Sequence, residues 1–286
     1  MSQGTHIQWT DATWVIAAGC NKVSKACRDC WAIVHAWRLA HNPNEKIARN
    51  YRGTVMKVGD KLNWTGKINP IEDRLNVVRK WKPQRIFVDS MSDIFHKGLP
   101  DDFRDMAFHV MADCPHHTFQ LLTKRIDEGE RYLQRFFPDG VPSHIHVGVS
   151  IADEEDAVKQ LPILAQVKAD VRWVSYEPAL GRVNWHEWFR RQACNWVVVG
   201  GESRNQTAFE PRPFNIWWAR ELINEARLFR SLGVRVFVKQ LGACPIEAPR
   251  HDGATGYQLK LKHKAGGNWD EWPEDLRVRE IAYEKQ

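Results

Sequence analysis

The chain has 286 residues, of which 43% are hydrophobic, and its 41 Lys and Arg against 35 Asp and Glu give a formal charge of +6. This length suits one large α/β domain or two smaller ones, each with a substantial core. No stretch approaches the roughly 18 uninterrupted apolar residues of a membrane helix, and the N-terminus lacks the features of an export signal. We therefore expect a soluble cytoplasmic protein whose basic balance favours a polyanionic partner.

Short β-branched runs alternate with longer helical stretches along the chain. The predicted strands are 14–18, 85–89, 118–123, 144–151, 171–176, 195–200 and 235–239. The predicted helices are 27–40, 70–81, 100–112, 126–136, 154–166 and 215–232. Strand followed by helix, in six to seven units, specifies parallel βα connections. We predict a partial or full parallel (β/α) TIM-like barrel, with a doubly wound sheet as the alternative.

Two segments interrupt this alternation. Residues 42–69 form a long basic insertion after the first helix. Its candidate nucleic-acid residues are Lys57, Lys61, Lys67 and Trp64. Basic side chains with interleaved aromatics suit a phosphate backbone, although a solvated basic loop has the same composition. Residues 244–286 form a C-terminal appendage that we expect to pack, through its tryptophans, on the barrel of residues 1–243.

Three of the six cysteines, Cys20, Cys27 and Cys30, lie within eleven residues directly after the first predicted strand. In a reducing compartment, clustered thiols indicate metal binding or catalysis rather than cross-links. Three thiolates suit a soft metal and leave one coordination position open, so an iron–sulfur cluster is our first interpretation. Zinc is the alternative, with His35 as the fourth ligand. The other three cysteines lie beside apolar runs and are interpreted as core residues.

Polar side chains follow the other predicted strands. In a parallel barrel the carboxyl ends of the strands carry the chemistry, because the loops there converge above the sheet. The candidate site residues at these ends are Asp89, Ser90, Asp93, Lys124, Arg125, Ser150, Glu177, Glu202 and Lys239. Several of these positions also suit helix N-caps. The cysteine loop follows the first strand at the same end, so we expect the metal and the polar ring to share one cavity.

The segments that carry these residues resemble a known protein family. They are Trp9–Trp14, Gly19–Ala32, Val88–Asp93, Gln120–Arg125, Gly148–Ser150, Ser175–Pro178, Gly200–Ser203 and Phe237–Gly242. In this order they are similar to a phage and prophage family of radical S-adenosylmethionine (SAM)-like proteins, mostly of unknown function. The resemblance implies a 4Fe-4S cluster on the cysteine triad, with SAM on the fourth iron. The first gap of the triad departs from the usual superfamily pattern, because it has six residues instead of three.

The resemblance also implies roles for the strand ends. One-electron cleavage of SAM to a 5′-deoxyadenosyl radical would draw its electron from an external reductant. By position, the residues that would bind the SAM amino group are Asp89, Ser90 or Asp93. Ser150 and Glu177 would reach its ribose or carboxylate, and Lys124 or Arg125 its carboxylate. Glu202 ends a Gly-Gly-Glu run that resembles the superfamily's SAM-binding motif in letters, although it follows the sixth strand. Glu177 and Lys239 are the candidate catalytic residues.

Phage relatives and the positive charge together indicate a nucleic-acid substrate. The resemblance suggests isomerase-type chemistry in the hypermodification of thymidine in DNA, inside a bacterial host, with the target base flipped into the cavity. Two other classes of function stay open on the residues alone. One is a zinc-stabilised nucleic-acid-binding protein without catalysis. The other is a barrel hydrolase or transferase that uses Glu177 or Glu202 as general base.

Overall fold

The computed structural model describes residues 4–204, 209–248 and 256–282, and the chain divides into two compact units. Unit 1 comprises residues 1–148, 167–170 and 206–208. Unit 2 comprises residues 149–166, 171–205 and 209–286. The chain passes from unit 1 to unit 2 within strand β8 (Ile145–Ile151).

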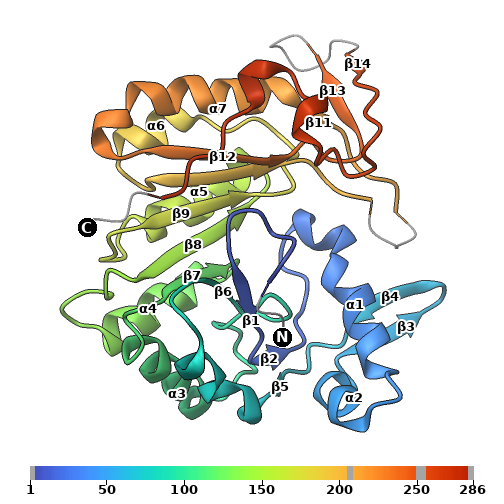
Figure 1. Cartoon of the computed structure of the whole chain (residues 1–286), viewed down its shortest axis with the longest axis vertical. Coiled ribbons are helices and arrows are strands. Elements are labelled where there is room, and N and C mark those ends of the chain that lie inside the picture. Colours follow the sequence, from blue (N-terminus) through green and yellow to red (C-terminus); the bar gives the residue numbers. More distant parts are fainter. Residues whose placement is uncertain (1–3, 205–208, 249–255, 283–286) are drawn as a thin grey trace. The chain divides into compact units, whose positions relative to one another are not determined.

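The main sheet has seven strands in the order β1-β6-β7-β8-β9-β10-β12 (Figure 1). Besides β8, they are β1 (Ala12–Trp14), β6 (Arg85–Val88), β7 (Thr118–Thr123), β9 (Arg172–Tyr176), β10 (Trp196–Gly200) and β12 (Arg235–Gln240). The pairs β1–β6, β6–β7, β9–β10 and β10–β12 are parallel. Because β1 and β12 stand at opposite ends of this order, the sheet is open. The predicted parallel (β/α) fold is confirmed in its partial-barrel form.

Helices separate successive strands, as the sequence predicts. They are α1 (Trp31–Ala40), α2 (Glu45–Tyr51), α3 (Asp101–Ala112), α4 (Ile126–Phe136), α5 (Glu154–Leu164), α6 (Trp185–Arg190) and α7 (Ile216–Leu228). Every residue of β8 and of β10 is buried, which is typical of strands covered on both faces. Side chains cap three of the helices, because Asn44 accepts the N–H of Lys46, Asp153 that of Asp156 and Asn215 that of Trp217.

The first predicted strand is two strands in the structure. After β1 the chain bends, and β2 (Ala17–Ala18) pairs with β5 (Asn69–Pro70) instead of with the main sheet. The bend has a clear cause: Asp89 Oδ1 accepts the backbone N–H groups of Ile16 and Ala17, at 3.3 and 3.0 Å. The carboxylate of Asp89 therefore ties the segment between β1 and β2 to the turn after β6.

The first predicted helix is also interrupted. A 3₁₀ turn, η1 (Lys25–Asp29), precedes α1, and Cys30 between them has an extended backbone with φ −71° and ψ 116°. The helix predicted over 70–81 is likewise the 3₁₀ segment η2 (Glu72–Lys80). The predicted 215–232 helix ends earlier, at Leu228, before the short turn η3 (Arg230–Leu232).

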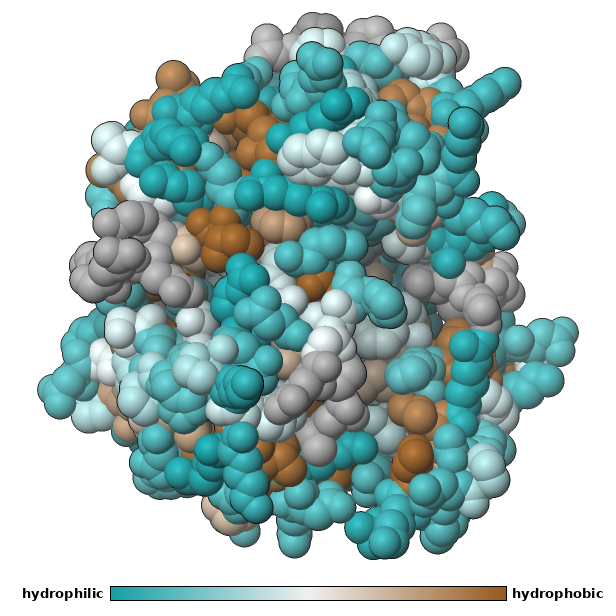
Figure 2. Space-filling view, in the orientation of Figure 1, coloured by the Kyte–Doolittle hydropathy of each residue, from teal (hydrophilic) through white to brown (hydrophobic). Residues whose placement is uncertain are grey.

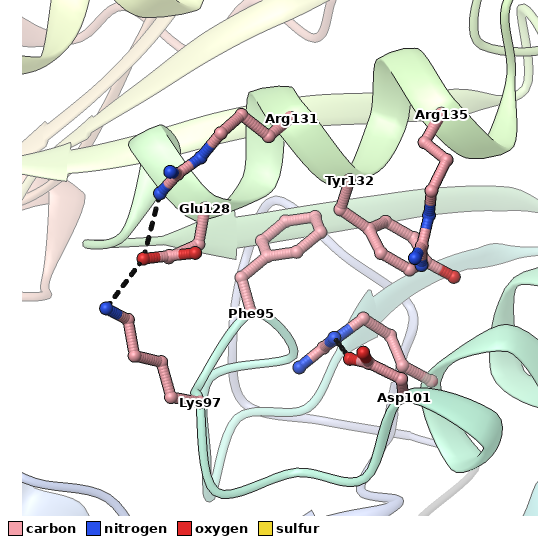
Figure 3. Close-up of a pocket in the computed structure, with 8 residues that line it drawn as sticks. Phe95, Lys97, Asp101, Glu128, Arg131, Tyr132 and Arg135 are labelled. Carbon is pink, nitrogen blue, oxygen red and sulfur yellow. Dashed lines mark hydrogen bonds and ion pairs between the residues drawn. The ribbon is translucent and has the colours of Figure 1, made fainter.

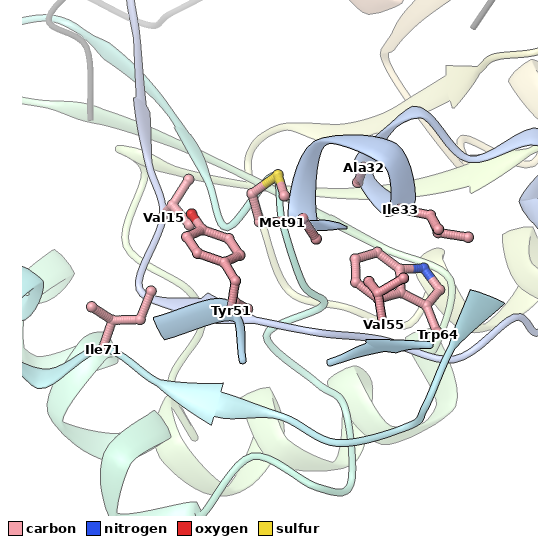
Figure 4. Close-up of a cluster of buried hydrophobic side chains, with 10 residues drawn as sticks. Val15, Ala32, Ile33, Tyr51, Val55, Trp64, Ile71 and Met91 are labelled. Atoms are coloured by element: carbon pink, nitrogen blue, oxygen red, sulfur yellow. The ribbon is translucent and has the colours of Figure 1, made fainter. Parts of the chain in front are cut away.

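The basic insertion is a folded part of unit 1. It contains α2 and a hairpin of β3 (Val55–Val58) and β4 (Lys61–Trp64), which a two-residue turn at Gly59 joins. Figure 4 shows Val55 and Trp64 of the hairpin beneath the α1 residues Ala32 and Ile33, within one cluster of buried side chains. This packing gives residues 42–69, predicted from the sequence as a long basic insertion, a defined structure.

The C-terminal segment pairs with the end of the main sheet, within unit 2. Val238 donates to the carbonyl of Val278 at 2.8 Å, and Glu280 donates to that of Val236 at 2.9 Å. Trp272 is buried and donates its Nε1–H to Gly266 O at 2.8 Å. The remaining elements of this unit are β11 (Phe214–Asn215), β13 (Pro245–Glu247), β14 (Tyr257–Gln258), η4 (Trp269–Glu271) and η5 (Glu274–Leu276).

Hydrophilic side chains predominate on the face drawn in Figure 2, with separate smaller apolar areas between them. None of the helices in the described ranges combines the length and the hydropathy that crossing a bilayer requires.

Candidate metal centre

The cysteine loop begins at Gly19, which directs the chain out of β2. Its φ is +107°, and a Cβ added there would lie 2.0 Å from the carbonyl oxygen of Lys67. Its N–H donates to Met91 O at 3.1 Å, so the loop is tied to the segment after β6. Only glycine fits this position without moving the backbone of the insertion.

The three thiols come from three different local structures. Cys20 lies in an irregular segment after β2, Cys27 lies in η1, and Cys30 joins η1 to α1. All three are half-buried and reduced. Cys20 and Cys30 pack against the apolar cluster of Figure 4, which shields one side of the loop.

Within the described residues, no three His, Cys, Asp or Glu side chains converge on one ion-sized point. The zinc set predicted with His35 is therefore not assembled there; His35 is exposed on α1 and its ring lies 6.0 Å from that of Trp31. An iron–sulfur cluster takes one thiolate per iron, so its ligands do not meet at a point. Three half-buried thiols on one loop fit that kind of donor set.

A buried carboxylate anchors Arg125, a cation that reaches the cysteine loop. Asp93 accepts from the hydroxyl of Thr123 at 2.8 and 2.9 Å and from the N–H of Lys124 at 3.1 Å. It also forms an ion pair of 2.8 Å with the guanidinium of Arg125. With a further bond from the N–H of Phe95, the acceptor positions of Asp93 are occupied by the protein.

Arg125 reaches from this carboxylate to the first cysteine. Its second terminal nitrogen lies 3.8 Å from Cys20 Sγ, 3.2 Å from the carbonyl oxygen of Asn21 and 2.9 Å from Asn21 Oδ1. The same Asn21 Oδ1 contacts Nε2 of His96. Gly98 donates its N–H to Nδ1 of that ring at 3.0 Å, so the proton of the neutral ring belongs on Nε2, which donates to Asn21.

The surroundings distinguish the three thiols electrostatically. Burial raises the pKa of Cys20 to about 11, despite the nearby charge of Arg125. Burial likewise raises the pKa of Cys30, and the charge of Lys124 only partly opposes it. For Cys27, burial also raises the pKa, but Lys124 and hydrogen bonds from Val23 and Ser24 outweigh it and lower the pKa overall. Lys124 therefore acts on two thiols and Arg125 on the third.

Asp89 is the most deeply buried of the predicted acids in unit 1. It has a φ of +59° and is 3% exposed, and its Oδ2 has no hydrogen-bond partner within the described residues. Burial raises its pKa to about 8, against the two N–H groups on Oδ1. Ser90, the next residue, is half-buried in the turn after β6. In the structure, the Asp89 carboxylate accepts the N–H groups at the bend between β1 and β2, so Asp89 stabilises that bend.

In unit 2, Glu177 and Lys239 form an ion pair. Lys239 Nζ lies 2.9 Å from Glu177 Oε1, with side-chain exposures of 26% and 12%. The Ser175 hydroxyl donates to the other carboxylate oxygen at 3.4 Å. A Cβ at Gly200 would lie 2.9 Å from Glu177 Oε1, so glycine makes room for this carboxylate. Ser150 is buried on β8.

Glu202, in contrast, holds a loop. It is 5% exposed and accepts the backbone N–H and Nε–H of Arg212 at 2.8 and 2.9 Å, while Arg212 also pairs with its other oxygen. The preceding Gly201 has the backbone of Leu241 against it, because an added Cβ would lie 2.6 Å from that carbonyl. Close packing therefore accounts for the two glycines of the Gly-Gly-Glu run, and the ion pair with Arg212 accounts for its glutamate. The SAM role predicted for Glu202 stays a prediction.

The prediction that Trp64 stacks on nucleic-acid bases is wrong. Trp64 is 6% exposed within the cluster of Figure 4, so its ring offers no face to a base. The predicted basic residues Lys57, Lys61 and Lys67 are all exposed. Their contact with nucleic acid stays a prediction. The prediction that unit 1 and unit 2 residues face a single cavity stays a prediction.

Sequence reasoning missed Asn21 and His96 as members of the site. Asn21 follows the first cysteine directly, and His96 lies three residues after Asp93 in a loop already singled out. Those positions were the available signal. Neither residue type is distinctive at such a place, so only the fold shows that they meet.

A cavity of about 460 Å³ also lies in unit 1, and Phe95 and Glu128 in its lining follow Asp93 and Arg125 closely in sequence. Figure 3 shows Lys97 and Arg131 both reaching the carboxylate of Glu128, each at 3.0 Å. Arg104 pairs with Asp101 in the same cavity. Its charged groups thus already have partners within the protein, and we assign it no ligand.

Comparison with known proteins gives three findings. No curated protein matches the chain. Among solved structures, the chain is similar to a cysteine-to-serine mutant of spore photoproduct lyase, at 11% identity and a TM-score of 0.42, over 94% of this chain and 72% of the other. The family model described as "Protein of unknown function (DUF5131)" matches residues 4–273. The chain therefore belongs to the DUF5131 family.

Proposed function

We propose that this chain is a radical SAM enzyme in which Cys20, Cys27 and Cys30 hold a 4Fe-4S cluster. The observation that carries the proposal is the triad of half-buried thiols on one loop beside two cations, Lys124 and Arg125. Neighbouring cations favour thiolates, which are the form that binds iron. When bound, such a cluster with SAM supplies a one-electron cleavage that yields methionine and a 5′-deoxyadenosyl radical.

The residues of unit 1 would hold the loop and orient SAM. Asp93 already accepts from several protein groups, so we assign the SAM amino group to Asp89 or Ser90. Lys124 is our candidate for the SAM carboxylate. The apolar cluster behind Cys20 and Cys30 would exclude water from one side of the centre, where a radical must be protected.

The residues of unit 2 would serve the substrate. Glu177 and Lys239 form a largely buried pair of opposite charge, which is able to hold and transfer a proton. We keep both as catalytic candidates and keep Ser150 as a candidate for the SAM ribose. Because Glu202 is committed to Arg212, we give it a structural role in this proposal.

For the substrate, we propose modified thymidine in DNA and isomerase-type chemistry. The support is the charge of +6, the exposed lysines of the insertion and the phage-family resemblance of the motifs. The lysines would contact phosphates along the duplex and hold it in register. An external one-electron reductant would be required.

Anaerobic reconstitution tests the proposal. We expect the protein to bind iron and sulfide, to turn brown, and to release 5′-deoxyadenosine when SAM and dithionite are added. Cys27→Ala should lose all three properties. Cys244→Ala is the matched control, because this half-buried cysteine of unit 2 lies outside the loop, and it should behave like the wild type.

Two results would contradict the proposal. A colourless wild-type protein with stoichiometric zinc would favour the zinc-stabilised nucleic-acid-binding alternative. A hydrolytic or transferase activity that is complete in Cys27→Ala and abolished in Glu177→Gln would favour the non-radical alternative.

A further inference from the structure

We propose that Arg125 and Lys124 set the reduction potential of the centre held by the cysteine loop. The inference rests on the proposed function, and it concerns the two cations rather than the ligands. It assigns them an electrostatic task that differs from binding substrate or forming the loop.

Arg125 is a cation fixed in place. Its side chain is 11% exposed, and its two terminal nitrogens bind separate partners. One binds Asp93 at 2.8 Å, and the other lies 2.9 Å from Asn21 Oδ1 and 3.8 Å from Cys20 Sγ. A guanidinium stays protonated at any physiological pH, so this charge and its N–H groups remain beside the first thiol.

The partner of Arg125 is itself held firmly. Asp93 is 5% exposed and accepts from Thr123, from the backbone of Lys124 and from the backbone of Phe95. Such a support fixes the direction of the guanidinium fork, as the residues behind a metal site commonly do. The carboxylate offsets part of the positive charge, but it leaves the N–H groups directed at Cys20 in place.

Lys124 precedes Arg125 and is held by the same carboxylate, because its backbone N–H donates to Asp93 at 3.1 Å. Its charge acts on both Cys27 and Cys30, whereas that of Arg125 acts on Cys20. The two consecutive residues both come from the turn after β7, and Asp93 holds both of them. Each ligand of the proposed cluster has a cation within electrostatic range.

Reduction adds an electron to a group already bound by three thiolates. A nearby cation, or an N–H directed at a ligand sulfur, stabilises the more negative reduced form more than the oxidised one. Both effects raise the potential, and partial burial strengthens them because solvent screens less. Removing either cation should therefore make the centre harder to reduce.

The experiment compares reduction potentials in the absence of SAM. We would reconstitute the wild type, Arg125→Gln, Lys124→Gln and Arg131→Gln, measure iron and sulfide per chain, and titrate each redox centre by electron paramagnetic resonance. Arg131→Gln is the matched control, since Arg131 is an exposed arginine of unit 1 that pairs with Glu128. We expect a roughly tenfold fall in the equilibrium constant for reduction in each test variant, about 59 mV for one electron, and no shift in the control.

Wild-type potentials in both test variants at full iron content would overturn the inference. Lys124→Gln leaves the Arg125–Asp93 pair intact, so it decides the case if Arg125→Gln fails to take up iron. An unchanged potential in Lys124→Gln together with iron loss in Arg125→Gln would overturn the inference too, and would assign Arg125 to holding the loop. Failure of the wild type to take up iron would instead refute the proposed function, so the two failures are distinguishable.

Discussion

Gly19 shows how one residue controls the path of the metal-binding loop. A methyl group there would overlap the carbonyl of Lys67, so the insertion or the loop must shift. We expect Gly19→Ala to lower both the melting temperature and the iron content after reconstitution. Gly59→Ala is the control, because Gly59 also has a positive φ but has open space around its Cβ position. Equal iron content in the two variants would show that Gly19 is not needed for the loop.

Asp89 makes a prediction about pH. Its folded pKa, raised to about 8 by burial, exceeds the unfolded value, so its contribution to stability is complete below about pH 4 and is lost as the pH rises through 8. Asn at this position can still accept the N–H groups of Ile16 and Ala17. We expect the melting temperature of the wild type to fall, relative to that of Asp89→Asn, between roughly pH 5 and pH 9.

Three neighbours modify this titration, since Asp93 raises the pKa of Asp89, Arg74 lowers it, and Tyr51 lies within electrostatic range of it. They are present in both proteins, so the comparison isolates the carboxyl group. Asp60→Asn, at an exposed acid of the hairpin turn, is the control and should follow the wild-type curve. Parallel curves for the wild type and Asp89→Asn would contradict the prediction.

At this scale the sequence identified the right neighbourhood but not the roles. Asp89, Asp93 and Arg125 were candidates because they follow buried strands. That Asp93 holds Arg125, and that Asp89 bends the chain, depends on contacts across more than thirty and more than seventy residues. No local pattern encodes such partners. The sequence therefore predicted these residues as SAM ligands and gave no sign of their structural roles.

At the scale of elements, long periodic segments were predictable and interrupted ones were not. Helix α4 and strand β7 have the predicted bounds, because apolar periodicity and polar ends agree there. The first strand and the first helix were each predicted as one piece. Tertiary hydrogen bonds divide the strand, and the extended backbone at Cys30 divides the helix.

The insertion supports a prediction about nucleic acid. We expect Lys57→Ala/Lys61→Ala/Lys67→Ala to lower the affinity for duplex DNA and to reduce its salt dependence, by about 0.9 in log–log slope for each lost phosphate contact. The control removes the same charge elsewhere in unit 1, at the exposed residues Lys80, Lys82 and Lys97. The measurement is binding across a range of salt concentrations. Identical slopes in both triple variants would remove the insertion from the DNA surface.

At the scale of the whole molecule, SAM binding should stabilise the folded chain. A ligand that binds only the native state adds about 2.7 kcal/mol at a hundredfold excess over its Kd. We therefore expect SAM to raise the melting temperature of the reconstituted protein and of Cys244→Ala, but not of Cys27→Ala. An equal rise in Cys27→Ala would mean that SAM binds without the cysteine-held centre.

The fold class was the part of the whole molecule that the sequence predicted best. Buried strands alternating with helices leave few connections other than parallel ones. The position of the boundary between the two compact units was not predicted, because it falls inside β8, a single strand in which every residue is buried. The two units are defined by contacts between segments that lie far apart in the sequence. The residues of one strand do not reveal such contacts.

The pairing of the C-terminal segment with β12 has a consequence for solubility. β12 is the last strand of the sheet, and the segment around Val278–Glu280 takes up backbone groups of β12 that would otherwise be open. An uncovered edge is a template for strands of other molecules. Proteolysis or a premature stop that removed this short stretch would therefore leave the sheet able to recruit further copies, and aggregation would be the first visible defect.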